Sequence, residues 1–256
     1  MKILHRFVLI TAFTFATCNY AYSGIINVGG VNWDPDALSD WSGVVGLVHQ
    51  DIDAVTGELS GYGRISSMNN TGSATFCPSC ELTFQFGGFM PSGSTLLPSA
   101  GLSIDYITGY LNVYVDVTPE TDDFDFTKLT ALNTGDEGGA NALWLSTIGH
   151  AYSGATSFTG TAVNTNGSLN LSGLGFLDVV GGLAAANLNT NTVVTDNGMA
   201  DIKFVTSFAI DVTPTYANGN GNYQGDSVAL VPTPANLMLF LFGSLGVLGL
   251  GRNKRK

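Results

Sequence analysis

The chain has 256 residues, of which 45% are hydrophobic and 11% aromatic, so it carries enough apolar material for a folded core. Residues 24–230 hold all 20 acidic residues but only three basic ones, Arg64, Lys128 and Lys203, which gives this stretch a formal charge of −17. Nucleic acids and anionic membrane surfaces are bound through Lys and Arg, so this charge argues against both as partners.

Residues 1–23 predict a removable signal peptide. Lys2 and Arg6 form a basic start, and residues 7–16 make an apolar stretch too short to span a bilayer. Ala21 and Ser23 then place small residues where signal peptidase reads the chain, so we expect cleavage before Gly24. Export, with signal peptidase as the first partner, is the resulting prediction.

Residues 24–214 predict one β-rich domain, because apolar residues recur there with a period of two. The clearest case is the run Ile202, Phe204, Thr206 and Phe208, which alternates with more polar residues. Other candidate strands cover residues 44–48, 57–65, 81–86, 102–107, 111–117, 143–152, 157–163 and 168–179. Gly- and Asn-rich turn clusters separate several of these strands, at 69–72, 133–136, 164–167 and 196–198. Only residues 126–132 and 182–188 could hold a helical turn, so we expect an all-β fold: a single antiparallel β-sandwich or a jelly-roll-like domain.

Cys77 and Cys80 are the two cysteines that remain after signal peptide removal. In an oxidising compartment two thiols this close are expected to form a local disulfide. The alternatives are a redox-active pair, which needs its first Cys at a helix N-terminus, and a zinc site. The flanking residues 75–76 and 81–86 are typical of strands, which favours a disulfide that closes a turn.

Two acidic groups are candidate calcium sites, because calcium is held by six to eight oxygens from Asp, Glu, Asn and backbone carbonyls. The first group is Glu120, Asp122, Asp123 and Asp125, and the second is Asp196, Asn197 and Asp201. Neither has the spacing of an EF-hand loop. The competing interpretation is that these are solvated loop residues of a very acidic protein, so we expect no obligatory cofactor and keep calcium as a candidate.

Catalysis has little support in the sequence. The exported part contains two histidines, His49 and His150, and no Gly-x-Ser-x-Gly motif. We interpret His150 as a half-exposed sheet residue, and we expect a non-enzymatic protein. Aromatic side chains could stack on sugar rings, but in a β-sandwich they more often belong to the core. These aromatics include Trp33, Trp41 and Trp144.

The C-terminal part predicts a spacer followed by a membrane-seeking tail. Residues 215–230 are rich in Gly and Asn and are interpreted as a flexible spacer. The tail, residues 231–256, combines a proline motif, an apolar run and a basic end. Its marker residues are Val231, Pro232, Thr233, Pro234, Arg252, Lys254, Arg255 and Lys256. As a helix, the 15 apolar residues 237–251 would reach about 22 Å, short of the roughly 30 Å hydrocarbon core, and the basic end should stay cytoplasmic.

This tail resembles the PEP-CTERM sorting signal of Gram-negative bacteria, with Thr233 where the usual Pro-Glu-Pro core has Glu. The resemblance covers residues 231–256 and implies a transient inner-membrane attachment and processing by an exosortase-type enzyme. It also implies final delivery to the cell surface or an extracellular matrix that contains exopolysaccharide. A plain C-terminal membrane anchor is the alternative interpretation of the same residues.

The first functional hypothesis is therefore an exported, non-enzymatic envelope or matrix protein associated with exopolysaccharide. The second is a calcium-assisted carbohydrate-binding or adhesive module, and the third is a secreted polysaccharide hydrolase. Nothing in the sequence of residues 24–214 identifies a ligand.

Overall fold

The computed structural model describes residues 24–37, 41–97, 99–117, 142–165, 168–210 and 216–229. The signal peptide, the tail and the acidic group from Glu120 to Asp125 lie outside these residues, so the predictions made for them stay predictions. Within the part of the chain that is described, no helix is long and apolar enough to cross a membrane.

The described chain is almost entirely β-structure, which confirms the predicted all-β class. The main strands are β3 (Trp41–Ile52), β4 (Leu59–Ile65), β7 (Glu81–Pro91), β8 (Ser103–Asp116), β9 (Ala142–Gly149), β10 (Thr156–Thr165), β11 (Ser168–Gly181), β14 (Ile202–Ile210) and β15 (Tyr216–Gly225). All the pairings between them are antiparallel.

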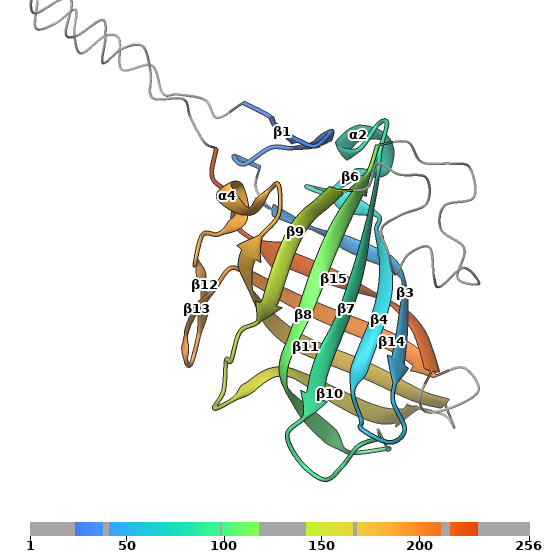
Figure 1. Cartoon of the computed structure of the whole chain (residues 1–256). Helices are drawn as coiled ribbons and strands as arrows, with labels where there is room; N and C mark the ends of the chain where they lie inside the picture. Colours follow the sequence, from blue (N-terminus) through green and yellow to red (C-terminus); the bar gives the residue numbers. More distant parts are fainter. Residues whose placement is uncertain are drawn as a thin grey trace, which may run out of the picture.

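These strands form a closed barrel, so the prediction of a sandwich or jelly roll was wrong (Figure 1). Strands β3, β4, β7 and β8 pair in sequence order, and β11, β14 and β15 do the same. β15 then pairs with β3, and β9 and β10 both lie between β8 and β11 as two halves of one interrupted strand. Eight staves thus return to their starting point. A sandwich has the same inward-outward alternation along each strand, so alternation alone cannot distinguish the two architectures.

The Gly- and Asn-rich segment interpreted as a spacer contains β15, so that interpretation was wrong for Tyr216–Gly225. Its exposure alternates: Gly221, Tyr223 and Gly225 are buried, whereas the residues between them are exposed. The segment lacked a hydrophobic period because glycine occupies inward positions where other strands carry apolar side chains. The β-domain consequently extends beyond residue 214.

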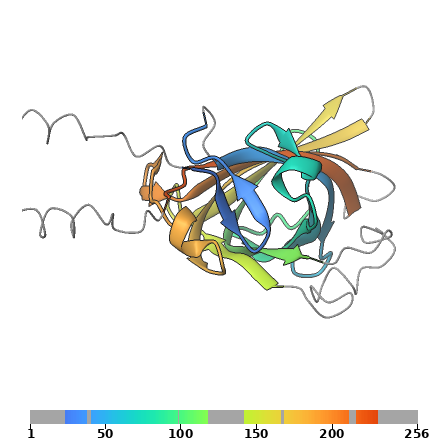
Figure 2. The same ribbon diagram turned by 90° about the horizontal axis from the view of Figure 1, so that it is seen from above.

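A plug of small elements covers one end of the barrel, called the plugged end below (Figures 1 and 2). It consists of the hairpin β1 (Ile26–Val28) and β2 (Val31–Trp33), the short ribbon β5 (Ser67–Met68) and β6 (Thr71–Gly72), and helix α2 (Ser73–Phe76). Residues 75–76, expected as strand, belong to this helix. The predicted disulfide between Cys77 and Cys80 is present. It follows this helix directly and joins the end of α2 to the start of β7.

Tryptophans fill the space between this plug and the barrel. Trp33 packs edge-on against Trp144, with ring centroids 5.7 Å apart, and Trp144 stacks on Trp41 at 6.4 Å. The indole N–H of Trp144 donates to the backbone oxygen of Val28, and that of Trp33 donates to Ser227 Oγ, both over 3.0 Å. The indole N–H groups of Trp33 in the plug and Trp144 in β9 are thereby satisfied inside an apolar cluster.

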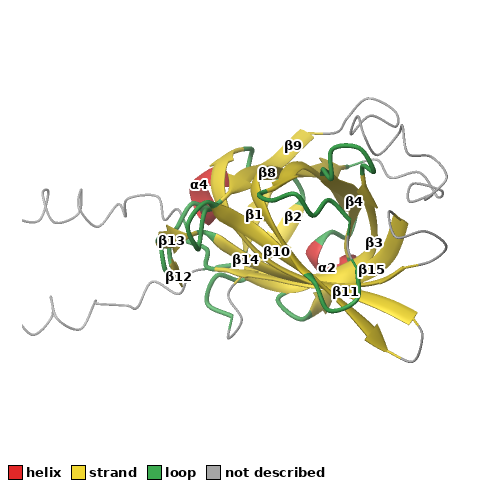
Figure 3. Ribbon diagram, turned by 90° about the horizontal axis from the view of Figure 1, so that it is seen from below, coloured by secondary structure: helices red, strands yellow, loops and turns green. Residues whose placement is uncertain are grey.

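The remaining small elements lie outside the barrel wall (Figures 1 and 3). Helix α4 (Ala185–Leu188) falls within the predicted helical segment 182–188 and contacts β9 and β11. The hairpin β12 (Val193–Thr195) and β13 (Gly198–Ala200) turns at the predicted cluster 196–198. Asp201, at the start of β14, accepts backbone N–H groups from Val179, Thr190 and Asn191 and holds this region to β11.

Candidate ligand-binding site

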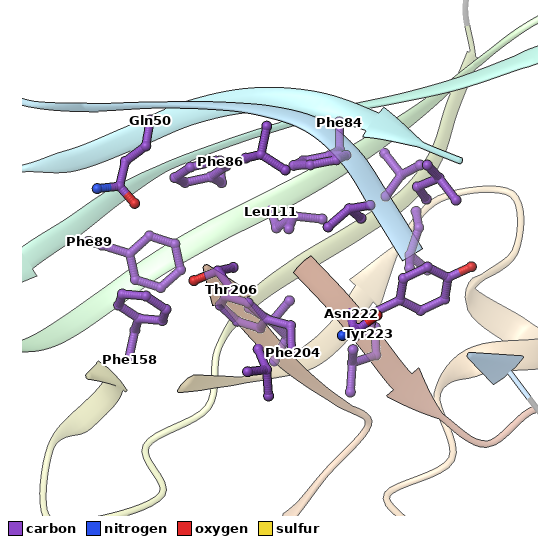
Figure 4. Close-up of a pocket in the computed structure, with 18 of the residues that line it drawn as sticks. Gln50, Phe84, Phe86, Phe89, Leu111, Phe158, Phe204, Thr206, Asn222 and Tyr223 are labelled. Carbon is purple, nitrogen blue, oxygen red and sulfur yellow. The ribbon is translucent and has the colours of Figure 1, made fainter. Parts of the chain in front are cut away.

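The barrel interior contains a cavity of about 60 Å³, called the upper cavity (Figure 4). Side chains from all eight staves line it. Much of its lining is aromatic, from Trp41, Phe84, Phe86, Phe158, Phe204 and Tyr223. The atoms that face the space are apolar, and none of the described residues that line it is charged. Eight-stranded barrels are just wide enough to be filled by side chains or to hold one small ligand, and this one leaves part of its interior unfilled.

Two features of the sequence position these rings: the alternation of inward and outward residues along each strand, and glycines on β11. Phe158 of β10 and Phe204 of β14 stack with centroids 5.5 Å apart and an interplanar angle of 9°. Both rings lie over glycines of β11: a Cβ at Gly173 would overlap the ring of Phe158, and one at Gly175 would lie 2.5 Å from Phe204. The glycines therefore leave the room that the aromatic pair occupies inside the barrel.

A second space of about 20 Å³, called the lower cavity, adjoins the upper one on the side away from the plug. Five residues line both spaces: Gln50, Leu59, Phe158, Thr206 and Phe208. About 10–15 Å³ is needed for one water-sized sphere, so the lower cavity has room for one small polar group.

Five polar residues line the lower cavity. Ser172 is exposed and the Thr161 hydroxyl lies 3.1 Å from that of Ser103, which leaves Gln50, Tyr106 and Thr206 as the inward-facing polar side chains. Gln50 is only 5% exposed and Tyr106 only 2%, and Thr206 Oγ1 is buried although the residue is not fully covered. Thr206 Oγ1 is buried and has no hydrogen-bond partner in the part of the chain that is described. The Gln50 carboxamide and the Tyr106 hydroxyl also make no hydrogen bond to a described residue, although neither group is as fully buried as Thr206 Oγ1. Buried polar groups are normally paired, because leaving one unpaired costs about 1–3 kcal/mol.

The surroundings of the interior tyrosines affect their ionisation. Burial raises the pKa of Tyr106 to about 12, and burial also raises the pKa of Tyr223. Tyr223 differs from Tyr106 in having a partner, since its hydroxyl donates to the backbone oxygen of Ser67 over 3.0 Å. Both phenols are therefore neutral at physiological pH, and the interior carries no charge from them.

One further interior donor lacks a partner among the described residues, the indole Nε1 of Trp41. Trp41 lines the end of the upper cavity nearer the plug, where its ring lies 4.5 Å from that of Tyr223. The Trp41 indole is a single donor, whereas three polar side chains lie together at the lower cavity, so the lower cavity is the stronger candidate for binding a polar group.

The sequence-predicted calcium sites gain no support. The first group, Glu120, Asp122, Asp123 and Asp125, lies outside the described residues. In the second group Asp201 is 1% exposed and accepts three backbone N–H bonds, so its oxygens are occupied by the fold. No cluster of three or more His, Cys, Asp or Glu suited to a metal occurs in the described ranges.

His150 lies between a hydroxyl and a carboxylate on the outer side of the barrel. Its Nδ1 is 2.9 Å from both oxygens of Asp178, and its Nε2 is 3.1 Å from Thr195 Oγ1. The Thr195 hydroxyl donates to the backbone oxygen of Gly198 over 3.0 Å and thus closes the turn of its own hairpin. We interpret this chain as a clamp between the β12–β13 hairpin and β11, with the imidazole half-buried as expected.

The three tryptophans are core residues rather than a surface platform for sugar rings. Trp33, Trp41 and Trp144 are each at most 3% exposed. Their burial favours the core over the stacking on sugar rings that the sequence left open.

Gln50, Tyr106 and Thr206 were not identified from the sequence as site residues. A signal existed for each of them: Gln50 shares the period-two face of Val48 and Ile52, and Tyr106 and Thr206 lie on predicted inward faces. Comparison with models of known protein families, with curated proteins and with solved structures returned no match.

Proposed function

We propose that this chain is an exported, non-enzymatic protein whose barrel binds one small, mainly apolar molecule. The observation that carries the proposal is the uncharged, aromatic-lined upper cavity inside a closed barrel. Binding there would remove apolar surface of the ligand from water, which contributes about 25 cal/mol per Å².

The size of the interior limits the ligand. Pockets for drug-sized molecules usually measure about 300–1,000 Å³, and a 150 Å³ apolar cavity is known to hold benzene. At about 60 Å³ and 20 Å³ the two cavities suit only a small molecule. A sugar ring would bring many hydroxyls into an apolar space, so we do not place exopolysaccharide inside the barrel.

In this proposal the tail is the targeting signal that directs the protein to its location. Its resemblance to PEP-CTERM signals supports delivery through the inner membrane to the cell surface or matrix, where contact with exopolysaccharide would use the outer surface of the protein. The barrel would then present or retain a small apolar molecule at that location.

A matched pair of valines tests the proposal. Val45 lines the upper cavity, whereas its neighbour Val44 is 41% exposed on the outer side of the same strand. Val45→Phe fills the cavity, and Val44→Phe makes the same change outside it. The probe is n-hexane, and the readouts are ligand-observed NMR and the shift in melting temperature.

We expect n-hexane to bind and stabilise the unmodified protein and Val44→Phe, but not Val45→Phe. Circular dichroism checks that both variants are folded. No saturable binding of n-hexane to the unmodified protein, or equal binding to both variants, would overturn the proposal of an internal site.

A further inference from the structure

We infer that the ligand is a neutral, unbranched aliphatic chain with one hydrogen-bonding head group, which lies in the lower cavity against Gln50, Tyr106 and Thr206. This inference rests on the proposed function, since it assigns the two ends of a molecule bound inside the barrel.

The head group is placed by the three unpaired polar side chains. All of them border the lower cavity. Thr206 Oγ1 is a buried atom without a partner among the described residues, and the Gln50 and Tyr106 side chains make no hydrogen bond to a described residue. A carboxamide and two hydroxyls can both donate and accept, so together they match a hydroxyl, a carbonyl or an amide. The lower cavity, at about 20 Å³, has room for one such group.

The chain is placed by the shape of the upper cavity. Figure 4 shows Phe84 and Phe86 on one side of it and Phe204 on the other, with Tyr223 at one end and Phe158 at the opposite end. The Gln50 side chain points toward the ring of Phe89, at the same end of the cavity as Phe158. The lining runs from Phe158 to Tyr223, which an extended chain follows better than a ring does. At about 60 Å³ the space is smaller than a benzene-holding cavity, so we expect side chains to move apart when a six-carbon chain binds.

The neutral character of the head group follows from charge. No described residue that lines either cavity is charged, so a carboxylate there would be buried without a cation. The acidic excess of the exported part adds repulsion for an anion. The interior therefore favours an alcohol, amide or ketone over a fatty acid anion.

A single bound water in the lower cavity is the competing explanation of the unpaired groups. A water needs two to four polar partners, which these three residues could supply. The water explanation predicts that a change of Gln50 alters the affinity equally for ligands with and without a head group. The ligand inference predicts a difference between them, and this difference is what the experiment measures.

The experiment uses three probes that share a six-carbon chain: hexan-1-ol, hexanoate and n-hexane. Each probe is titrated by ligand-observed NMR at pH 8 into the unmodified protein, purified from the cells that export it, and into two variants. Gln50→Met removes the carboxamide but keeps an unbranched side chain. Gln224→Met makes the same change on the outer face, where Gln224 is exposed.

We expect Gln50→Met to weaken hexan-1-ol binding by tenfold or more relative to n-hexane binding, while Gln224→Met leaves the binding of both probes unchanged. Hexanoate should bind the unmodified protein at least tenfold more weakly than hexan-1-ol. Lengthening the alcohol by one methylene should tighten binding roughly fourfold until the cavity is full.

Each contrary result points to a different failure. If hexan-1-ol and n-hexane bind but Gln50→Met weakens neither, the head group is wrongly placed and the proposed function survives. Equal binding of hexanoate and hexan-1-ol overturns the neutral head group. If none of the three probes binds, the proposed function fails together with this inference.

Discussion

The plug and the lower cavity differ in whether their buried polar side chains have hydrogen-bond partners. At the plug, Trp33 and Trp144 are almost fully buried, and each indole N–H has a hydrogen-bond acceptor at 3.0 Å. At the lower cavity, Gln50 and Tyr106 are almost as deeply buried, yet their side chains make no hydrogen bond to a described residue. The hydrogen bonds of Trp33 and Trp144 beside the plug are therefore complete, whereas the lower cavity has the features of a site that a second molecule completes.

The largest expected effect is at the plug, with Trp144→Ala. Trp144 has no exposed surface and contacts both Trp33 and Trp41, so its removal leaves a large void and should cost about 3–5 kcal/mol of unfolding free energy. Leu143→Ala is the control, since Leu143 is 40% exposed, and its cost should stay below that of Trp144→Ala by at least about 2 kcal/mol. Urea denaturation measures both, and equal costs would contradict a packed plug.

The next effect concerns Tyr106 and alkaline pH. Burial raises the pKa of Tyr106 to about 12, above the value near 10 that tyrosine has in an unfolded chain. A phenol whose pKa is higher in the folded state stabilises the fold below pH 10, and this contribution is lost as the pH rises from 10 through 12.

Between pH 9 and pH 11.5 the unmodified protein should therefore lose more unfolding free energy than Tyr106→Phe, by about 2 kcal/mol at most. Tyr223, whose pKa burial also raises, is present in both proteins, so the difference isolates Tyr106. Urea denaturation at the two pH values provides the measurement. Parallel losses would show that the Tyr106 hydroxyl reaches water in the folded protein.

A comparable effect is expected from the disulfide of the plug. The Cys77–Cys80 bond closes a loop of only four residues, for which the chain-entropy model gives about 2 kcal/mol. The double change Cys77→Ser and Cys80→Ser should lower the urea midpoint accordingly. It should leave n-hexane binding intact, because neither Cys lines either cavity. Loss of binding in this variant would show that the plug and the cavity are not independent.

The period-two pattern predicted the walls of this barrel well. On β14, Ile202, Phe204, Thr206 and Phe208 face inward as their alternation indicates, and they line the interior. Closure could not be predicted in the same way, because it depends on the pairing of β15 with β3, two strands from opposite ends of the domain. Strand β15 itself was missed because glycine at inward positions removes the hydrophobic signal while preserving the alternating exposure.

The candidate site was predictable only in part. Inward orientation follows from alternation, so Gln50 could be placed inside by extending the pattern from Val48 to Ile52. Whether an inward polar group finds a partner depends on side chains from several strands. Thr147 and Thr206 illustrate this: Thr147 Oγ1 donates to the backbone oxygen of Leu111 over 2.8 Å, whereas Thr206 Oγ1 has no described partner. No local sequence feature distinguishes the two threonines.

Substitutions of these two threonines test the contrast between paired and unpaired buried polar groups directly, and they have the smallest expected effects. Thr147→Val removes a satisfied hydroxyl and its hydrogen bond to the carbonyl of Leu111, so it should cost about 1 kcal/mol of unfolding free energy. Thr206→Val removes an unpaired hydroxyl at similar shape, so in the ligand-free protein it should stabilise by about 1 kcal/mol. Urea denaturation of both variants decides the sign of each change. A cost for Thr206→Val in the absence of ligand would show that water already satisfies this oxygen, and only the plug would then remain as evidence for the contrast.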